Sequence, residues 1–225
     1  NMSESNKRNF IVHGSILAIA GILVRIIGML YRIPVVNIIG SEGNGIYGAA
    51  FNIYNIMLVL SSYGLPMAVS KLVSARFTKK RYKSAAKVLR CSLMVAVCTG
   101  GIAALLVFFG ASFIENVIYG GGLPGLAVPL RILAPTIFLV AILGVIRGFF
   151  QGQSTMIPTA VSQILEQIVN AIVSIAAGYG MMKAFASLPD VAAYGAAGST
   201  LGTAMGAPVS YTHLRAHETL ANLVC

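Results

Sequence analysis

Long apolar segments, separated by short polar ones, dominate this sequence from Phe10 onward. Several of them reach about 20 residues, the length that an α-helix needs to cross a hydrocarbon core of about 30 Å. The pattern therefore predicts an all-α integral membrane protein rather than a water-soluble domain. About six transmembrane helices are expected, at residues 10–39, 46–68, 88–109, 126–150, 158–182 and 191–207.

The connections between these segments predict turns and loops. Residues 40–45 are rich in glycine and indicate a turn. Residues 110–125 are also rich in glycine and carry no Lys or Arg, which favours an external loop. Residues 183–190 are expected to form a second external loop, and residues 151–157 a short cytoplasmic turn.

The last residues, 208–225, break the pattern because they are abruptly polar and leave the sixth span short. This stretch, PVSYTHLRAHETLANLVC, resembles translated read-through of a sequencing adaptor. We expect it to be non-native and foreign to the fold, so His213 and His217 are not taken as metal or catalytic candidates. A genuine polar C-terminal tail is the alternative.

Composition and charge agree with a membrane protein. Hydrophobic residues make up 57% of the chain and charged residues 10%, with a mean hydropathy of +0.83; a soluble domain carries about a quarter charged residues. The net charge of +10 is concentrated between Lys71 and Arg90, where no Asp or Glu occurs. A short basic connection between apolar runs is typical of a cytoplasmic loop and would face anionic lipid. The polar segment 1–9 is then also cytoplasmic, and no motif accompanies the charge that would indicate nucleic-acid binding.

Polar residues within the spans are the candidates for function, because charge at membrane depth is costly. In the first span, Gly21, Arg25, Gly28 and Arg32 are spaced so that they share one stripe of a helix. Arg25 lies about 22 Å along the helix from Phe10, near mid-membrane. Snorkelling to the interface is an alternative for Arg32, but explains Arg25 less well.

Three further spans carry polar stripes. Such residues either form a site or hydrogen-bond helices to one another, at about 0.6 kcal/mol each. The stripes are Asn52, Asn55 and Ser62; Gly144, Arg147, Gly148 and Gln151; and Thr159, Ser162, Gln163, Glu166, Gln167, Asn170 and Ser174.

Glu166 is the only acidic residue within a predicted span, and the hairpin of the fourth and fifth spans allows it to approach Arg147. Such a pair is either structural, or an ion or proton site, or a gate. With Arg25 and Arg32 added, three arginines face one carboxylate. This balance favours an anionic ligand, since arginine matches phosphate oxygens by bidentate hydrogen bonds.

Two long motifs resemble a known family. They are GSILAIAGILVRIIGMLYRIPVVNIIGSEGNGIYGAAFNIYNIMLVLSSYGLPMAVSKLVS, residues 14–74, and RGFFQGQSTMIPTAVSQILEQIVN, residues 147–170. Both are similar to the polysaccharide-biosynthesis or stage V sporulation protein B family of the multidrug/oligosaccharidyl-lipid/polysaccharide exporter superfamily, which includes lipid II flippases. Residues 10–207 resemble its N-terminal half.

The resemblance implies the N-terminal lobe of a bilobed flippase in the bacterial cytoplasmic membrane. Two lobes would enclose a central cavity and move an undecaprenyl-pyrophosphate-linked saccharide or peptidoglycan precursor to the outer leaflet. Family members are about twice this length, so the partner expected beside membrane lipids and the lipid-linked oligosaccharide is the missing C-terminal lobe. Alternating access needs both halves.

The expected substrate-binding residues and the coupling or gating residues follow from the stripes and the resemblance together. Alternatives are a cation-coupled multidrug antiporter of the same superfamily and a non-transporting scaffold in envelope or spore assembly. The absence of catalytic, nucleotide-binding or metal motifs argues against an enzyme, and no cofactor is expected. The residues are Arg25, Arg32, Asn52, Arg147 and Gln151 for substrate, and Glu166, Gln167 and Asn170 for coupling or gating.

Overall fold

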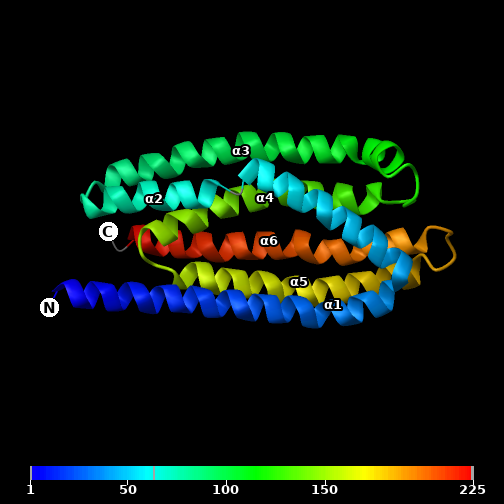
Figure 1. Cartoon of the computed structure of the whole chain (residues 1–225), viewed down its shortest axis with the longest axis horizontal. Coiled ribbons are helices and arrows are strands. Elements are labelled where there is room, and N and C mark those ends of the chain that lie inside the picture. Colours follow the sequence, from blue (N-terminus) through cyan, green and yellow to red (C-terminus); the bar gives the residue numbers. More distant parts are fainter. Residues whose placement is uncertain (1, 63, 224–225) are drawn as a thin grey trace.

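The computed structural model describes the backbone of residues 2–62 and 64–223, and the side chains of residues 12, 14–62 and 64–217. No side chain is therefore described in the predicted cytoplasmic segment 1–9 or at residues 218–225 of the predicted tail. For residues 2–9 and 218–223 the structure describes a helical backbone only. The described chain is an elongated bundle of helices (Figure 1). Its elements are α1 (Met2–Ser62), α2 (Leu65–Thr78), α3 (Tyr82–Phe113), the π-helical turn η1 (Ile114–Ile118), α4 (Ala127–Gly152), α5 (Ile157–Ala184) and α6 (Val191–Leu223).

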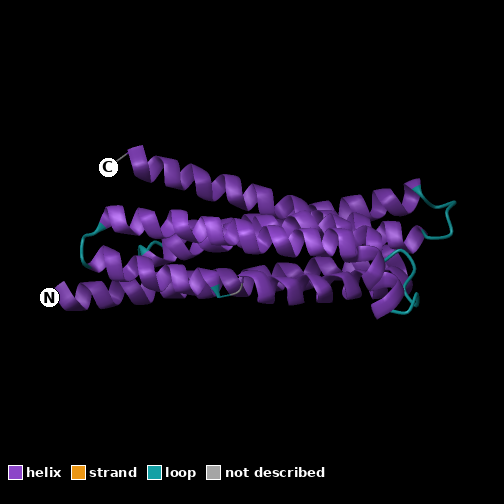
Figure 2. Cartoon of the chain, turned by 90° about the horizontal axis from the view of Figure 1, so that it is seen from above, coloured by secondary structure: helices purple, strands orange, loops and turns teal. Residues whose placement is uncertain are grey.

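The chain runs back and forth along the bundle. The first part of α1 leads from the N-terminal end to the opposite end, and the rest of α1 returns with α2 (Figure 1). Helices α3, α4, α5 and α6 then alternate in direction, so the C-terminus lies at the same end as the N-terminus (Figures 1 and 2). The basic turn between α2 and α3 and the α4–α5 connection also lie at this end. This arrangement places the basic α2–α3 turn at the same end of the molecule as both termini.

The predicted turn at residues 40–45 is wrong in extent. Helix continues on both sides of Gly40, which alone has non-helical backbone angles inside α1, with φ 72° and ψ −176°. A positive φ is open to glycine because it has no Cβ. One residue therefore suffices to fold α1 back on itself, where the sequence pattern indicated a six-residue turn.

Other helix boundaries also differ from the predicted spans. Predicted span 46–68 is divided near its end, because α1 stops at Ser62 and α2 starts at Leu65. Pro66, in the first turn of α2, lacks an N–H and is tolerated there. Helix α3 begins six residues before predicted span 88–109 and ends four residues after it. Apolar length predicts only the part of a helix that lies in the hydrocarbon, and α3 extends past that part on both sides.

Glu115 organises the end of the bundle opposite the termini. The backbone N–H groups of Gly125 and Ala127 donate to its two carboxylate oxygens, at 3.1 and 2.7 Å. The first N–H groups of a helix have no partner within the helix and carry partial positive charge. Glu115 therefore caps α4. Its carboxylate stabilises the segment that the sequence predicted as an external loop.

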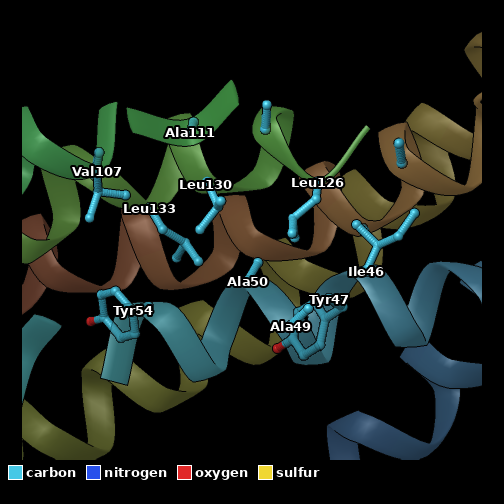
Figure 3. Close-up of a cluster of buried hydrophobic side chains, with 14 of the residues drawn as sticks. Ile46, Tyr47, Ala49, Ala50, Tyr54, Val107, Ala111, Leu126, Leu130 and Leu133 are labelled. Carbon is cyan, nitrogen blue, oxygen red and sulfur yellow. The ribbon is translucent and has the colours of Figure 1, made fainter. Parts of the chain in front are cut away.

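The main buried cluster joins α1, α3 and α4. Residues from the returning part of α1, such as Ala50 and Tyr54, lie across from Leu130 and Leu133 of α4 and Val107 of α3 (Figure 3). These side chains are almost fully buried. Tight packing of this kind holds helices together in a membrane, where the hydrophobic effect between them is weak.

Two rows of glycine allow helices to approach closely. On α4, Gly144, Gly148 and Gly152 lie one turn apart, and a Cβ at each would meet Pro66 or Ser70 of α2 within about 3 Å. On α6, Gly198, Gly202 and Gly206 form an equivalent row against α5. Small residues at four-residue spacing are a known device for close helix contact in membranes.

Four helical stretches of the described chain are long and apolar enough to cross a membrane: Gly14–Thr78, Tyr82–Ile118, Ala127–Gly152 and Ile157–Ala184. The first contains the reversal at Gly40, so it passes along the bundle twice. Helix α6 is not among the four, although it contacts α1, α4 and α5. Its residues 192–193 and 195–200 are buried by these neighbours, which makes its small and hydroxyl side chains compatible with a membrane interior.

Residues 208–223 of the predicted tail continue α6 as helix. This end of α6 diverges from the other helices (Figure 2), although Ser210 and Leu214 are buried. Predicted span 191–207 is thus the first half of a longer helix. The non-native origin of the tail stays a prediction.

We expect Gly202→Ala to destabilise the protein, because the new methyl group would collide with Asn170 backbone and the Ser174 hydroxyl. Overpacking of this kind costs about 1–3 kcal/mol. Gly180→Ala on α5 is the matched control, since a Cβ there meets nothing within 4 Å. Thermal unfolding in detergent should show a lower Tm for Gly202→Ala alone; equal Tm values for the two variants would refute the close packing of α5 and α6.

Candidate functional site

Arg147 and Glu166 form a salt bridge, as the sequence predicted for the α4–α5 hairpin. The guanidinium Nη2 of Arg147 donates to Glu166 Oε2, and also to the hydroxyl of Ser210 on α6 at 2.8 Å. The two side chains are 16% and 23% exposed, so the pair is largely removed from solvent. Helices α4, α5 and α6 therefore meet at one partly buried ionic contact, called here the Arg147 cluster (Arg147, Glu166 and Ser210).

Tyr54 of α1 lies beside this cluster. The residue is buried and lies within electrostatic range of both Glu166 and Arg147. The Nε–H of Arg147 is buried without a hydrogen-bond acceptor among the described residues. A buried donor without an acceptor weakens the arrangement, because its desolvation is not repaid.

Gly144, Arg147, Gly148 and Gln151 share one stripe of α4, as their spacing predicts, but its glycines and its arginine contact different helices. Gly144 and Gly148 pack against Pro66 of α2, whereas Arg147 reaches Glu166 and Ser210. Arg147 and Gly148 lie about 100° apart around the helix, at the two edges of this stripe, and they reach different neighbours here. The glycines serve helix packing, and Arg147 belongs to the polar centre.

A second polar group surrounds Asn170, one turn beyond Glu166 on α5. The Asn170 side-chain amide donates to the Tyr31 hydroxyl of α1 at 3.3 Å. Its carbonyl oxygen lies 3.0 Å from the Ser174 hydroxyl and 3.3 Å from that of Thr203 on α6. Ser174 has one proton to give and lies nearer to the Ser199 carbonyl, at 2.7 Å. Asn170 thus links α1, α5 and α6.

Arg32 connects to this group through two tyrosines. Its guanidinium lies over the Tyr47 ring, 5.3 Å from the centroid, and the Tyr47 hydroxyl is 3.3 Å from that of Tyr31. We call Tyr31, Tyr47, Asn170, Ser174 and Thr203 the Asn170 network. The polar pattern of the sequence did not predict a role for either tyrosine, although Tyr31 is next to Arg32 and Tyr47 follows the Gly40 reversal within two turns.

The remaining predicted site residues lie at the edge of these groups or away from them. Arg25 and Asn52 are exposed, and Gln151 is half-buried. Gln167 packs against Gly28, where an added Cβ would lie 3.1 Å from its amide nitrogen. The structure therefore joins Arg32, Arg147, Glu166, Gln167 and Asn170 to a common region of α1 and α5. Among the described side chains, Arg25 and Asn52 form no hydrogen bond or salt bridge to that region.

The charges of this region are unbalanced. Glu166 is engaged by Arg147, whereas Arg25 and Arg32 form no salt bridge with any described carboxylate. No group of three or more His, Cys, Asp and Glu within the described part of the chain is placed to hold a metal ion. Exposed arginines without a carboxylate partner can bind the phosphate or carboxylate groups of a ligand.

Known relatives share the sequence pattern. The family model described as polysaccharide biosynthesis protein matches residues 11–222. The chain is 34% identical over 176 residues to the lipid II flippase MurJ of Bacillus subtilis (strain 168), covering 76% of this chain and 32% of that protein. It is 31% identical over 209 residues to stage V sporulation protein B of the same organism, covering 92% of this chain and 39% of the relative. The chain thus spans about a third to two fifths of the length of these relatives.

A solved structure shares the fold. It is the MOP superfamily transporter from Pyrococcus furiosus, which superposes with a TM-score of 0.72 over 92% of this chain and 44% of that one, at 17% identity. At this identity the likeness concerns the fold alone. Because the family model covers almost the whole sequence and the helices suit a bilayer, this multi-pass membrane protein belongs to the polysaccharide biosynthesis protein family.

Proposed function

We propose that the chain forms one lobe of a flippase for a lipid-linked saccharide. The substrate would be an undecaprenyl-pyrophosphate-linked saccharide or peptidoglycan precursor, moved from the inner to the outer leaflet of the bacterial cytoplasmic membrane. The observation that carries the proposal is the charge of α1, where Arg25 and Arg32 are exposed and not paired with a described carboxylate. The lipid II flippase named among the relatives supports the substrate class.

Geometry supports a role for Arg32 in particular. The Tyr47 ring holds its guanidinium from one side, which leaves hydrogen-bond donors for a ligand. Arg25 lies two turns away on the same stripe of α1, about 10 Å along the helix axis. A phosphate-containing head group could contact both arginines, since each can form bidentate bonds to phosphate oxygens.

Arg147 has a different role in this proposal. It is engaged by Glu166 and Ser210, so binding a substrate would require it to exchange partners. We assign Arg147 and Glu166 to gating, and Gln167 and Asn170 to the contact between α1 and α5 that must change with it. Gln151 and Asn52 remain proposed substrate contacts, on the strength of the sequence pattern alone.

The orientation follows from the distribution of charge. The basic α2–α3 turn, the α4–α5 connection and both described ends of the chain lie at one end of the bundle. Positive charge favours the cytoplasmic side. We therefore place the N-terminus in the cytoplasm and assign six membrane passages, with Gly40 at the outer surface.

Transport requires a second lobe. Alternating access depends on two halves that rock about a site between them, and this chain spans under half of its named relatives. The site would be completed by that lobe. The cation-coupled antiporter is less well supported, because the acidic side chain of α5 is already paired with Arg147.

In a full-length transporter that contains this lobe, Arg25→Ala and Arg32→Ala should each slow translocation of a pyrophosphate-linked lipid. A loss of about tenfold or more is expected, since a hydrogen bond to a charged group contributes about 1.5–3 kcal/mol. Arg25→Lys should recover part of the rate, because it keeps the charge but not the bidentate geometry.

Arg131→Ala is the matched control for these variants. Arg131 is exposed and donates to Ser112 near the opposite end of the bundle from the termini. Its loss should leave translocation near the wild-type rate in reconstituted vesicles. Unchanged transport in Arg25→Ala and Arg32→Ala would contradict the proposed substrate contact.

The Arg147–Glu166 pair can be tested by comparing a single variant with a double variant. Glu166→Gln should lower the Tm more than the joint replacement Arg147→Met with Glu166→Gln, because the single change leaves a largely buried arginine without its carboxylate. The expected destabilisation of the single variant is about 3 kcal/mol, the low end of the range for a buried pair, because both side chains keep some exposure. If the pair gates transport, the double variant should regain stability and still translocate slowly; wild-type translocation in the double variant would reduce the pair to a structural contact.

A further inference from the structure

A pocket lies between α2 and α3, near the basic turn that connects them. Its volume is about 310 Å³. Helix α2 contributes Leu72 and Arg76, one turn apart. The Arg76 guanidinium donates to the Leu72 carbonyl at 3.2 Å, which holds the side chain along the helix. Its lining residues, from Leu72 to Ser92, include none of the residues assigned to the transport site.

One face of α3 forms the other wall. Ser84, Lys87, Val88, Cys91 and Ser92 line it, at the spacing of a single helical stripe. Two hydroxyls and an ammonium group therefore stand opposite the guanidinium of Arg76. Val88, Cys91 and Leu72 supply apolar surface beside them. A ligand that suits this wall has an anionic group attached to an apolar body.

No local acid neutralises the pocket. The sequence holds no Asp or Glu between Glu42 and Glu115, and neither Arg76 nor Lys87 forms a salt bridge with a described carboxylate. Both cations are thus available to a negatively charged ligand. Phosphate oxygens accept from Arg, Lys and Ser, which are the donors present here.

The position of the pocket matches the surface of a bilayer. From Ser84 to Ser92 the helix rises about 12 Å, enough to pass from the head groups into the first part of the hydrocarbon. Tyr82 is exposed beside the opening and contacts Phe77 edge to face, with ring centroids 5.2 Å apart. Tyrosine at the end of a spanning helix is typical of the membrane–water interface.

We propose that this pocket binds the phosphate head group of an anionic phospholipid from the surrounding leaflet. Arg76 and Lys87 contact the phosphate, Ser84 and Ser92 donate hydrogen bonds, and Leu72 and Val88 meet the upper acyl chains. The site is separate from the proposed transport site and does not depend on it. Basic pockets between spanning helices suit such lipids.

Cysteine chemistry offers a direct test, because Cys91 lines the pocket and Cys98 lies two turns further along α3, exposed but outside it. With Cys225→Ser as background, the whole chain is alkylated with N-ethylmaleimide in micelles that contain phosphatidylglycerol or phosphatidylcholine. Phosphatidylglycerol should slow alkylation of Cys91 by roughly tenfold, within the about 30-fold preference for anionic lipid that two cations near a membrane surface provide, and leave Cys98 unchanged.

Two double variants distinguish lipid binding in the pocket from a general effect of positive charge. Arg76→Gln with Lys87→Gln should abolish the protection, whereas Lys79→Gln with Lys83→Gln, which removes the same charge outside the pocket, should preserve it. Equal protection by phosphatidylcholine, equal loss in both variant pairs, or no protection of Cys91 would overturn the proposal. Protection by inorganic phosphate without lipid, at comparable concentration, would overturn the lipid assignment in favour of a soluble anion. The lipid comparison in the unaltered pocket decides the proposal even if a variant fails to fold.

Discussion

Close contact between helices along the glycine rows of α4 and α6 is the constraint on which the remaining structure depends. Helices in a bilayer gain little from burying apolar surface against one another, so they associate through tight packing and polar contacts. Gly144, Gly148 and Gly152 bring α2 against α4, and Gly198, Gly202 and Gly206 bring α6 against α5. Helices α4 and α6 are thereby fixed inside the bundle. The polar side chains of α5 then have partners within reach.

The polar centre follows from this packing. Arg147 bridges from α4 to Glu166 on α5 and Ser210 on α6, while Asn170 joins α5 to Tyr31 of α1 and Thr203 of α6. Each group would be costly in a membrane without its partners. Any movement of α1 relative to α5 must therefore break or exchange the Tyr31–Asn170 contact. Such exchange is what a gate requires, and it connects the stability of the lobe with the proposed transport.

The sequence predicted what depends on local pattern. The helical class, the approximate positions of α4 and α5 and the Arg147–Glu166 contact follow from apolar length, charge and the proximity of two helices in a hairpin. The predicted turn at residues 40–45 was too long, because a single glycine with positive φ can reverse the helix. Such a reversal does not require turn residues on either side of the glycine. The sequence also did not predict that Gly144 and Gly148 pack against Pro66 of α2, because that contact depends on where α2 lies relative to α4.

Other features depend on helices that meet only in three dimensions. Tyr31 and Asn170 are 139 residues apart, so their hydrogen bond has no signature in local spacing. The glycine row of α6 was visible as a four-residue repeat, but its partner helix was not. Buried hydroxyls of α6, such as Ser199 and Thr200, likewise make sense only once neighbouring helices are known to cover them.

The central claim, an anionic substrate for an arginine-bearing lobe, is tested most directly by comparing two classes of substrate in one preparation. Vesicles that contain a full-length transporter with this lobe would be loaded with a fluorescent pyrophosphate-linked lipid saccharide or, separately, with a fluorescent lipophilic cation. The account predicts that the transporter accelerates translocation of the pyrophosphate-linked lipid and leaves the cation unaffected. Accelerated movement of the cation, with the anionic lipid unchanged, would contradict it.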